Sequence, residues 1–331
     1  MEYNTFIDEL KMHILSNAKW DIQEENYTFF PDGYTSEDPK MLKFVFNTNM
    51  KYHKMESDVL IGDFIQLEFP DLDGSNMCRF SVKYLYEEFL EQGWEQIDEM
   101  ILENLKIALD TSISQITSNL NNFDFIRERL FLRPLNYTDN ELELKNCVYR
   151  LYGDIALVLY VLLYDNPKTG IGSMKIHKDV ANSWGKELSK VWEEALLNTN
   201  VLAPPRMYLT QEEADQHKYT TGAFMAINSP VRQFERSFAP VVTTTRVTNG
   251  AIAMFYPGVL QKIAEMCNGS YYIAFTSIED ARIHPENTLP PSQISQFLKN
   301  VNEMFNNPED VLTRNVFFYN KRTGALEIIK L

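Results

Sequence analysis

Hydrophobic positions change their period several times along the chain. From residue 3 to 16, and again from residue 81 to 109, apolar side chains recur at the spacing of one face of an amphipathic helix. Between residues 27 and 70, short runs rich in aromatic and β-branched residues predict strands, and DLDGS at 71–75 predicts a turn. The first third of the chain therefore predicts one helix and a few strands, followed by a helical middle region.

The run at 155–164, IALVLYVLLY, is nearly all apolar, so its periodicity does not choose between a buried strand and a buried helix. The turn signal DNPKTGIG follows it, and residues 172–176 then alternate, which favours a β-hairpin of the two segments. Next comes a helical pattern from 179 to 198, for which Asp179 is the expected N-cap.

The last third of the chain mixes strand and helix patterns. GAFMAI and VVTTTRVT predict strands, and residues 248–285 predict a strand–helix–strand unit around which the other elements are organised. A helix led by Pro290 and Pro291 follows this unit. The chain then ends in a predicted hairpin, VLTRNVFFYN with ALEIIKL.

These elements predict an α+β protein, in which a helical middle region packs with a mixed, largely antiparallel, hairpin-rich sheet. Three regions are expected: an N-terminal α/β region at 1–80, a helical region at 81–140 and an α+β sheet region at 141–331. A chain of 331 residues holds one large domain or two ordinary ones. The three regions are therefore either separate or parts of one continuous domain.

The charge limits the partners that the chain is expected to bind. With 31 basic against 46 acidic residues, the net charge is −15, which disfavours direct binding to nucleic-acid backbones and to anionic membranes. The same charge is compatible with a cationic protein partner, or with imitation of nucleic acid by an array of carboxylates.

Three further observations favour a cytoplasmic protein. No apolar run approaches the roughly 18–20 residues of a membrane span. Residues 1–15 contain no basic segment followed by an apolar one, the pattern of a secretory leader. Cys78, Cys147 and Cys267 are far apart in sequence, so they offer no disulfide framework and fit a reducing compartment.

Motifs that would identify an enzyme or a metal site are absent from the sequence. There is no HExxH, no Gly-x-Ser-x-Gly elbow, no Walker A loop and no Rossmann glycine fingerprint, and the five histidines are far apart. The sequence therefore predicts neither a cofactor nor a metal ion.

The densest group of charged residues is Glu279, Asp280, Arg282, His284 and Glu286. If the chain is extended here, Asp280, Arg282 and His284 lie on one face of the strand. A carboxylate, a guanidinium and an imidazole on one face suit a general acid/base site. They equally suit a solvated sheet face with one salt bridge, and this structural interpretation is favoured.

Three segments carry a resemblance to a known family: SMKIHKDVANSWGKELSKVWEEALLNT at 173–199, TNGAIAMFYPGVLQKIAEMCNGSYYIAFTSIEDARIHP at 248–285 and NVNEMFNNPEDVLTRNVFFYN at 300–320. They resemble the signature regions of an uncharacterised Firmicutes family that is known only as a domain of unknown function. FIRERLFLRPLNYTDNELELKN and GDIALVLYVLL are similar to its central segment, so the resemblance covers nearly the whole chain. It implies no established activity, cofactor or catalytic residue.

The resemblance also singles out one motif. Members of that family usually read Ser-Ser-Ile-His-Glu after the second strand of the 248–285 region, whereas this chain reads Thr-Ser-Ile-Glu-Asp at 276–280. If the motif is catalytic in relatives, the loss of its histidine implies the loss of the activity. If the motif is structural, the exchange is harmless.

Two hypotheses from different classes follow. The favoured one is a non-enzymatic, cytoplasmic interaction protein that binds another protein, with a mobile-element or phage inhibitor of a host defence system or nuclease as one version. The alternative is a small-molecule or hydrolytic enzyme whose site lies at the strand exit, residues 276–286, with Asp280, Arg282 and His284 converging in a concave pocket.

Overall fold

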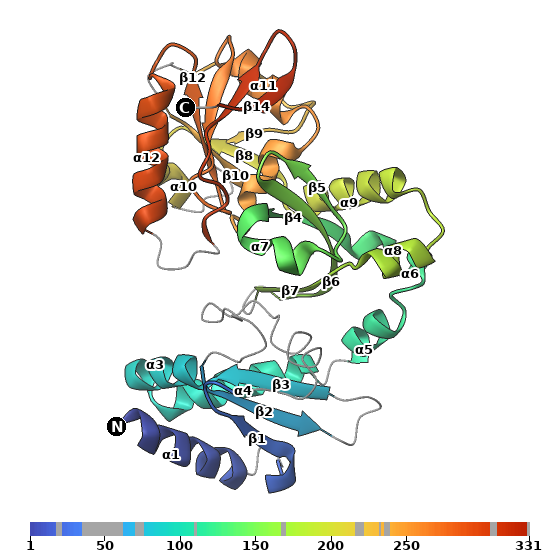
Figure 1. The fold of residues 1–331 in the computed structure, drawn as a ribbon, viewed down its shortest axis with the longest axis vertical. Coiled ribbons are helices and arrows are strands. Elements are labelled where there is room, and N and C mark those ends of the chain that lie inside the picture. Colours follow the sequence, from blue (N-terminus) through green and yellow to red (C-terminus); the bar gives the residue numbers. More distant parts are fainter. Residues whose placement is uncertain are drawn as a thin grey trace. The chain divides into compact units, whose positions relative to one another are not determined.

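A computed structural model of the protein divides the chain into two compact units, Met1–Thr117 and Ser118–Leu331 (Figure 1). The structure describes residues 1–17, 22–34, 62–69, 76–108, 111–166, 170–215, 222–231, 233–234, 239–304 and 310–329. The boundaries expected at 80/81 and 140/141 fall inside these units. Strand β3 (Asn76–Ser81) leads directly into helix α3 (Val82–Gln92), and helix α7 (Tyr137–Leu144) spans residue 140.

The N-terminal unit packs helices against a small sheet. Helix α1 (Tyr3–Ser16) is followed by a 3-10 turn, η1 (Glu24–Asn26), and by the antiparallel strands β1 (Tyr27–Phe30), β2 (Phe64–Phe69) and β3. Helix α3 and helix α4 (Trp94–Ala108) come next, and α5 (Thr111–Ser118) ends this part of the chain. The helices predicted at 3–16 and after residue 81 are confirmed. The MLKFVF segment and the DLDGS turn lie outside the described residues.

One hydrophobic core unites the elements of the N-terminal unit. Helices α1, α3 and α4 contribute apolar positions at helical spacing, and strands β2 and β3 contribute alternate positions. The buried members are Phe6, Leu10, Ile14, Ile22, Ile65, Leu67, Cys78, Phe80, Val82, Leu85, Ile97, Ile101 and Leu105.

The C-terminal unit contains two sheets, of which the smaller lies earlier in the chain. After α6 (Phe123–Ile126) and η2 (Arg127–Arg129), strands β4 (Leu130–Asn136), β5 (Tyr149–Tyr152) and β7 (Gly170–Lys175) all pair antiparallel with β6 (Ile155–Asn166). The predicted hairpin of 155–164 with 172–176 is therefore confirmed. The Thr199 hydroxyl accepts a hydrogen bond from the Leu132 backbone N–H, which ties helix α9 (Leu188–Leu202) to β4.

The single helix predicted at 179–198 is wrong. The chain forms α8 (Lys178–Ser183) and α9, separated at Gly185, whose φ of 59° is left-handed and ends the first helix. The N-cap of α8 is His177, and its side chain makes no capping hydrogen bond. Asp179 instead lies in the first turn of α8, where its carboxylate interacts favourably with the positive end of the helix dipole.

The larger sheet has seven strands in the order β14-β13-β11-β12-β10-β8-β9, and every neighbouring pair is antiparallel. The strands are β8 (Pro205–Tyr208), β9 (Ala223–Phe224), β10 (Val241–Thr244), β11 (Tyr271–Ala274), β12 (Ala281–Pro285), β13 (Phe317–Asn320) and β14 (Ala325–Ile328). The predicted C-terminal hairpin is β13–β14, and the predicted α+β class with antiparallel sheets is confirmed. Helix α10 (Gln211–Asp215) follows β8, and helix α12 (Pro291–Met304) follows Pro290 as expected.

The strand predicted at the start of the 248–285 region is a 3-10 helix, η3 (Gly250–Phe255), followed by α11 (Val259–Met266). An added Cβ at Gly250 would lie 2.1 Å from Thr243 Oγ1 and 2.3 Å from the Glu279 carbonyl oxygen, so the backbone packs against β10 too closely for any side chain. Residues 250–254 are all buried. A short apolar run buried on every side has no alternation by which to recognise its conformation.

Strand β11 faces two different layers. On one face, Ala274 and Tyr272 pack in a cluster with Ile294 and Leu298 of α12. On the other face, the Tyr271 hydroxyl donates a hydrogen bond to the Leu260 carbonyl oxygen in α11. Helix α12 therefore covers the Tyr272–Ala274 face of the sheet, as its place beside the sheet in Figure 1 shows.

Candidate functional site

The register between β11 and β12 decides which side chains of the charged group lie together. Tyr272 is paired with His284, and Ala274 is paired with Arg282. Because directly opposite residues of an antiparallel pair project from the same face, Arg282 and His284 lie on the face that α12 covers. Ala281 precedes Arg282 in β12, so its side chain lies on the opposite face of the sheet, where it is fully buried.

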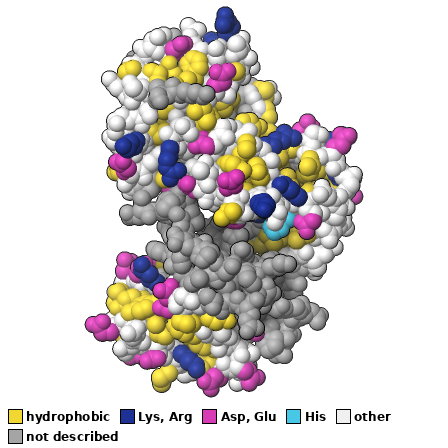
Figure 2. Space-filling view, in the orientation of Figure 1, with side chains coloured by type: hydrophobic (Ala, Val, Ile, Leu, Met, Phe, Trp, Pro, Cys, Tyr) yellow, Lys and Arg dark blue, Asp and Glu magenta, His cyan; other side chains and the backbone are white. Residues whose placement is uncertain are grey.

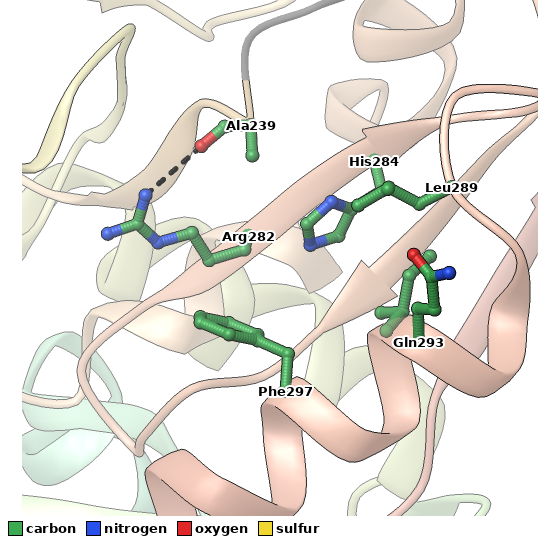
Figure 3. Close-up of a pocket in the computed structure, with 7 residues that line it drawn as sticks. Ala239, Arg282, His284, Leu289, Gln293 and Phe297 are labelled. Atoms are coloured by element: carbon green, nitrogen blue, oxygen red, sulfur yellow. Dashed lines mark hydrogen bonds between the residues drawn. The ribbon is translucent and has the colours of Figure 1, made fainter.

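Arg282 and His284 line a cavity of about 360 Å³ (Figure 3). The remaining lining residues come from the segment before β10, from the turn before α12 and from α12 itself: Ala239, Leu289, Gln293, Ile294 and Phe297. The imidazole of His284 meets the Phe297 ring edge to face, with centroids 6.4 Å apart. Figure 3 shows the His284 ring between Arg282 on one side and Gln293 on the other, with Phe297 across the cavity.

The packing of α12 explains why a cavity forms at this place. Ile294 and Leu298, four residues apart, hold the helix against Ala274 of β11. The flank of the helix that carries Gln293 and Phe297 therefore lies over β12, and these two side chains line the cavity together with Arg282 and His284. The volume lies near the lower end of the roughly 300–1,000 Å³ of small-molecule pockets, which suits one residue-sized group.

His284 is the most unusual side chain of the cavity. It is only 6% exposed, and its Nε2 atom has no hydrogen-bond partner in the described part of the chain. Burial, and secondly the positive charge of Arg282, lower the pKa of His284 from 6.5 to about 4. The ring is therefore neutral near neutral pH and keeps one unsatisfied polar atom, which costs about 1–3 kcal/mol.

Arg282 supplies the positive charge of the site. Its Nη1 donates to the Ala239 carbonyl oxygen at 3.2 Å, and the guanidinium extends toward that carbonyl in Figure 3. None of the seven described lining residues is an aspartate or glutamate, although the chain as a whole carries a net charge of −15. The electrostatic character of the described lining is therefore that of one fixed cation among apolar walls.

Asp280 lies in the turn before β12. It precedes the first residue of β12, and its carboxylate accepts a hydrogen bond from the Thr276 hydroxyl within the turn that joins β11 to β12. Asp280 is not among the described residues that line the cavity. The structure therefore places Arg282 and His284 in one site and Asp280 in the turn beside it.

The Thr-Ser-Ile-Glu-Asp motif at 276–280 forms that turn. The Ser277 hydroxyl accepts from the Glu279 backbone N–H at 2.9 Å, and the Thr243 hydroxyl of β10 donates to the Glu279 carbonyl at 2.6 Å. The Ile278 backbone bonds to two further segments, accepting from Ala251 and donating to the carbonyl of Asp310. These bonds give the motif a structural role in this chain, as the anchor of η3, β10 and the segment before β13.

The described lining of the cavity offers one imidazole, one guanidinium and one amide as its polar groups. An imidazole with a pKa of about 4 is a weak base near neutral pH, and none of the described lining residues is a nucleophile. Burial raises the pKa of the Cys78 thiol to about 12, so this cysteine is inert. The described residues contain no group of three or more His, Cys, Asp and Glu that is placed to hold a metal ion.

Sequence reasoning found the two polar residues of the site but missed its walls. Leu289, Gln293 and Phe297 come from the helix after β12, and Ala239 comes from the segment before β10. The sequence contains one signal for these walls. Leu298 belongs to the buried stripe of α12 and Phe297 comes directly before it, so Phe297 projects at the edge of the buried face. The sequence does not show which strand lies beneath that edge.

The model of a family of unknown function (DUF5688) matches residues 71–321, so the chain belongs to that family. The match includes every described residue of the cavity, and it confirms the resemblance to an uncharacterised family. No curated protein and no solved structure matches the chain. Among the described residues, no helix combines the length and the apolar character needed to cross a membrane.

Proposed function

We propose that the protein is a non-enzymatic binding protein and that its C-terminal unit holds a partner protein at the cavity between β12 and α12. The observation that carries this proposal is the buried, unpartnered Nε2 of His284, a residue that lines an apolar cavity together with Arg282. Folding buries this atom without a hydrogen bond, which lowers the stability of the folded protein. A bound partner that supplies the missing hydrogen bond removes this loss of stability. Buried polar groups without partners are rare, and functional sites are one setting in which they occur.

Exposed apolar side chains beside the cavity support a protein as the partner. Leu289 is 41% exposed, Phe297 is 42% exposed and Met304 is 79% exposed. Phe297 and Met304 are seven residues apart, so they lie on the same side of α12. A pocket with an apolar rim suits a protein interface in which one partner side chain is an anchor and neighbouring contacts exclude water.

The enzyme hypothesis has one observation in its favour, namely the cavity itself with a histidine of perturbed pKa. A general base is most effective when its pKa lies near the working pH, and the pKa of His284 lies well below neutrality. The expected carboxylate, Asp280, is bonded within the neighbouring turn. Binding therefore fits the site better than acid/base catalysis.

Imitation of nucleic acid is the version of the binding hypothesis that the surface supports least. Figure 2 shows one face of the molecule, and there the Asp and Glu side chains lie scattered among hydrophobic and basic groups. A mimic needs its carboxylates at spacings close to those of phosphates along one face. We therefore attribute partner binding to the cavity and its apolar rim.

Affinity capture with matched variants tests the proposal. Wild-type protein, Arg282→Gln and Arg322→Gln are immobilised, and proteins from cells of the source organism are captured and identified by mass spectrometry. Arg322 lies in the exposed turn between β13 and β14, so its exchange is the matched control. The proposal expects a partner that wild type and Arg322→Gln retain and Arg282→Gln loses. Equal recovery on all three proteins would contradict it.

A further inference from the structure

The smaller sheet of the C-terminal unit carries two cations over one tyrosine ring. Lys175 of β7 lies directly opposite Tyr160 of β6. Arg133 of β4 and Ser173 of β7 lie opposite positions two residues away from Tyr160 along β6, so these side chains project from one face. Arg133 crosses this face: its Cζ lies 5.0 Å from the centre of the Tyr160 ring, and its Nη1 donates to the Ser173 hydroxyl at 3.3 Å. None of these residues is in the described lining of the cavity between β12 and α12.

The charges on this face do not balance. Lys175 Nζ lies 5.8 Å from the centre of the same Tyr160 ring and forms an ion pair with Glu143 of α7. Arg133 forms no ion pair within the described part of the chain, and its Nε is buried without a hydrogen bond. Burial raises the pKa of Tyr160, and the charged groups that act on its hydroxyl are these two cations and the Glu143 carboxylate. One positive charge is therefore left over on a partly buried face.

This face offers mainly hydrogen-bond donors to a ligand. A guanidinium has five N–H donors, an ammonium has three, and neither group accepts a hydrogen bond. Arg133 donates to Ser173 and Lys175 donates to Glu143, which leaves further N–H groups on both cations. The Ser173 hydroxyl accepts from Arg133 and keeps its own proton to donate. The ligand that fits such a set of donors is an oxyanion.

We propose that Arg133, Lys175 and Ser173 bind the phosphate group of a phosphorylated ligand. A phosphate ester carries close to two negative charges near neutral pH. Two cations match this charge once Lys175 exchanges the Glu143 carboxylate for the phosphate. The Glu143 side chain is 26% exposed, so it reaches water when it leaves Lys175. This inference goes beyond the proposed function, because it concerns a second site on a different sheet.

The geometry favours a phosphate over a carboxylate. An arginine binds a carboxylate best through two parallel N–H groups along one edge of the guanidinium. In Arg133 one such edge contains the buried Nε, and the other contains Nη1, which already donates to Ser173. A tetrahedral phosphate instead accepts single hydrogen bonds from several directions. Arg133 on β4, and Ser173 and Lys175 on β7, approach from two different strands and supply such donors.

Phosphorus-31 NMR titration of inorganic phosphate with the full chain, at neutral pH and constant ionic strength, tests the inference. We expect Arg133→Gln to weaken binding at least about tenfold, the scale of one charge-assisted hydrogen bond, and Arg133→Lys to retain part of the affinity. Glu143→Gln should tighten binding about twofold to fivefold, because it removes the carboxylate that competes for Lys175. Arg127→Gln removes the same charge at an exposed position in η2 and should leave binding unchanged. Circular dichroism confirms that each variant folds.

Each other outcome has a defined meaning. Equal affinity of wild type and Arg133→Gln overturns the site, and unchanged or weaker binding by Glu143→Gln overturns the exchange at Lys175. Displacement of phosphate by an equal concentration of acetate shows a general anion site and overturns the preference for phosphate. Acetyl-Ala-phosphoserine-Ala-amide then distinguishes two sources of the phosphate group. Tighter binding of this peptide than of glycerol phosphate supports a phosphorylated polypeptide as the ligand, and the reverse order supports a small phosphate ester.

Discussion

Replacing His284 with phenylalanine should make the C-terminal unit less sensitive to acid. In the folded protein, burial and the Arg282 charge hold the pKa of His284 at about 4, whereas in the unfolded chain it returns to its ordinary value of 6.5. Between these two values the unfolded chain binds more protons than the folded one. The free energy of unfolding therefore decreases as the pH falls through this window. Phenylalanine keeps a flat ring and removes the titration.

The magnitude follows from the two pKa values. The full difference between 6.5 and about 4 corresponds to about 3 kcal/mol of stability, all of it lost below about pH 4. About 2 kcal/mol of this loss falls between about pH 7 and about pH 5. At neutral pH, His284→Phe also removes an unsatisfied buried polar atom. The variant should therefore be about 1 kcal/mol more stable there, against the usual direction of core substitutions.

Hydrogen exchange followed by mass spectrometry measures this effect where it occurs. Peptides that contain β11 and β12 report the opening free energy of the C-terminal unit, independently of the N-terminal unit. His177→Gln is the control because it also removes one histidine, at an exposed position outside the described lining of the cavity. The reasoning is refuted if wild type and His284→Phe lose the same opening free energy between the two pH values.

Three further predictions follow from particular contacts. Gly250→Ala should lower the melting temperature strongly, by about 2 kcal/mol or more in stability, because its Cβ would lie 2.1 Å from Thr243 Oγ1; a melting temperature like that of wild type would contradict this packing. Thr276→Val should cost about 1 kcal/mol in urea denaturation by removing the hydrogen bond to Asp280, and an unchanged midpoint would show that this bond contributes nothing to stability. Phe297→Ala should weaken capture of the partner protein about tenfold with little change in melting temperature, whereas Phe125→Ala, whose ring is exposed to a similar extent at 44%, should leave capture unchanged; equal losses in both variants would contradict a specific contact.

Local patterns predict much of the fold. Helices α1, α3 and α12 and the hairpins β6–β7 and β13–β14 are recognisable because each depends on residues close in sequence, with apolar positions at the spacing of its own period. The errors have two causes, one a contact between distant segments and the other a local break in the backbone. Gly250 has no side chain and so allows η3 to pack closely against β10. Gly185 adopts a left-handed backbone conformation, which divides one helical pattern into two helices.

The candidate site is predictable only in part, for a related reason. Alternation along an extended chain correctly places Arg282 and His284 on one face, but it also places Asp280 there. The bond from Thr276 draws Asp280 into the turn, so β12 begins one residue later. The walls of the cavity depend on how α12 packs across β11, which involves side chains about twenty residues apart that no local period relates.

The most direct test of the central claim is an NMR titration of the His284 imidazole in the full chain, with and without the partner protein that affinity capture identifies. In the free protein we expect a pKa of about 4. A partner that supplies the missing hydrogen bond to Nε2 changes the surroundings of the ring, so it should shift the His284 signals and their pH dependence. If the partner leaves the His284 signals and their pH dependence as they are in the free protein, the cavity is not the binding site that we propose.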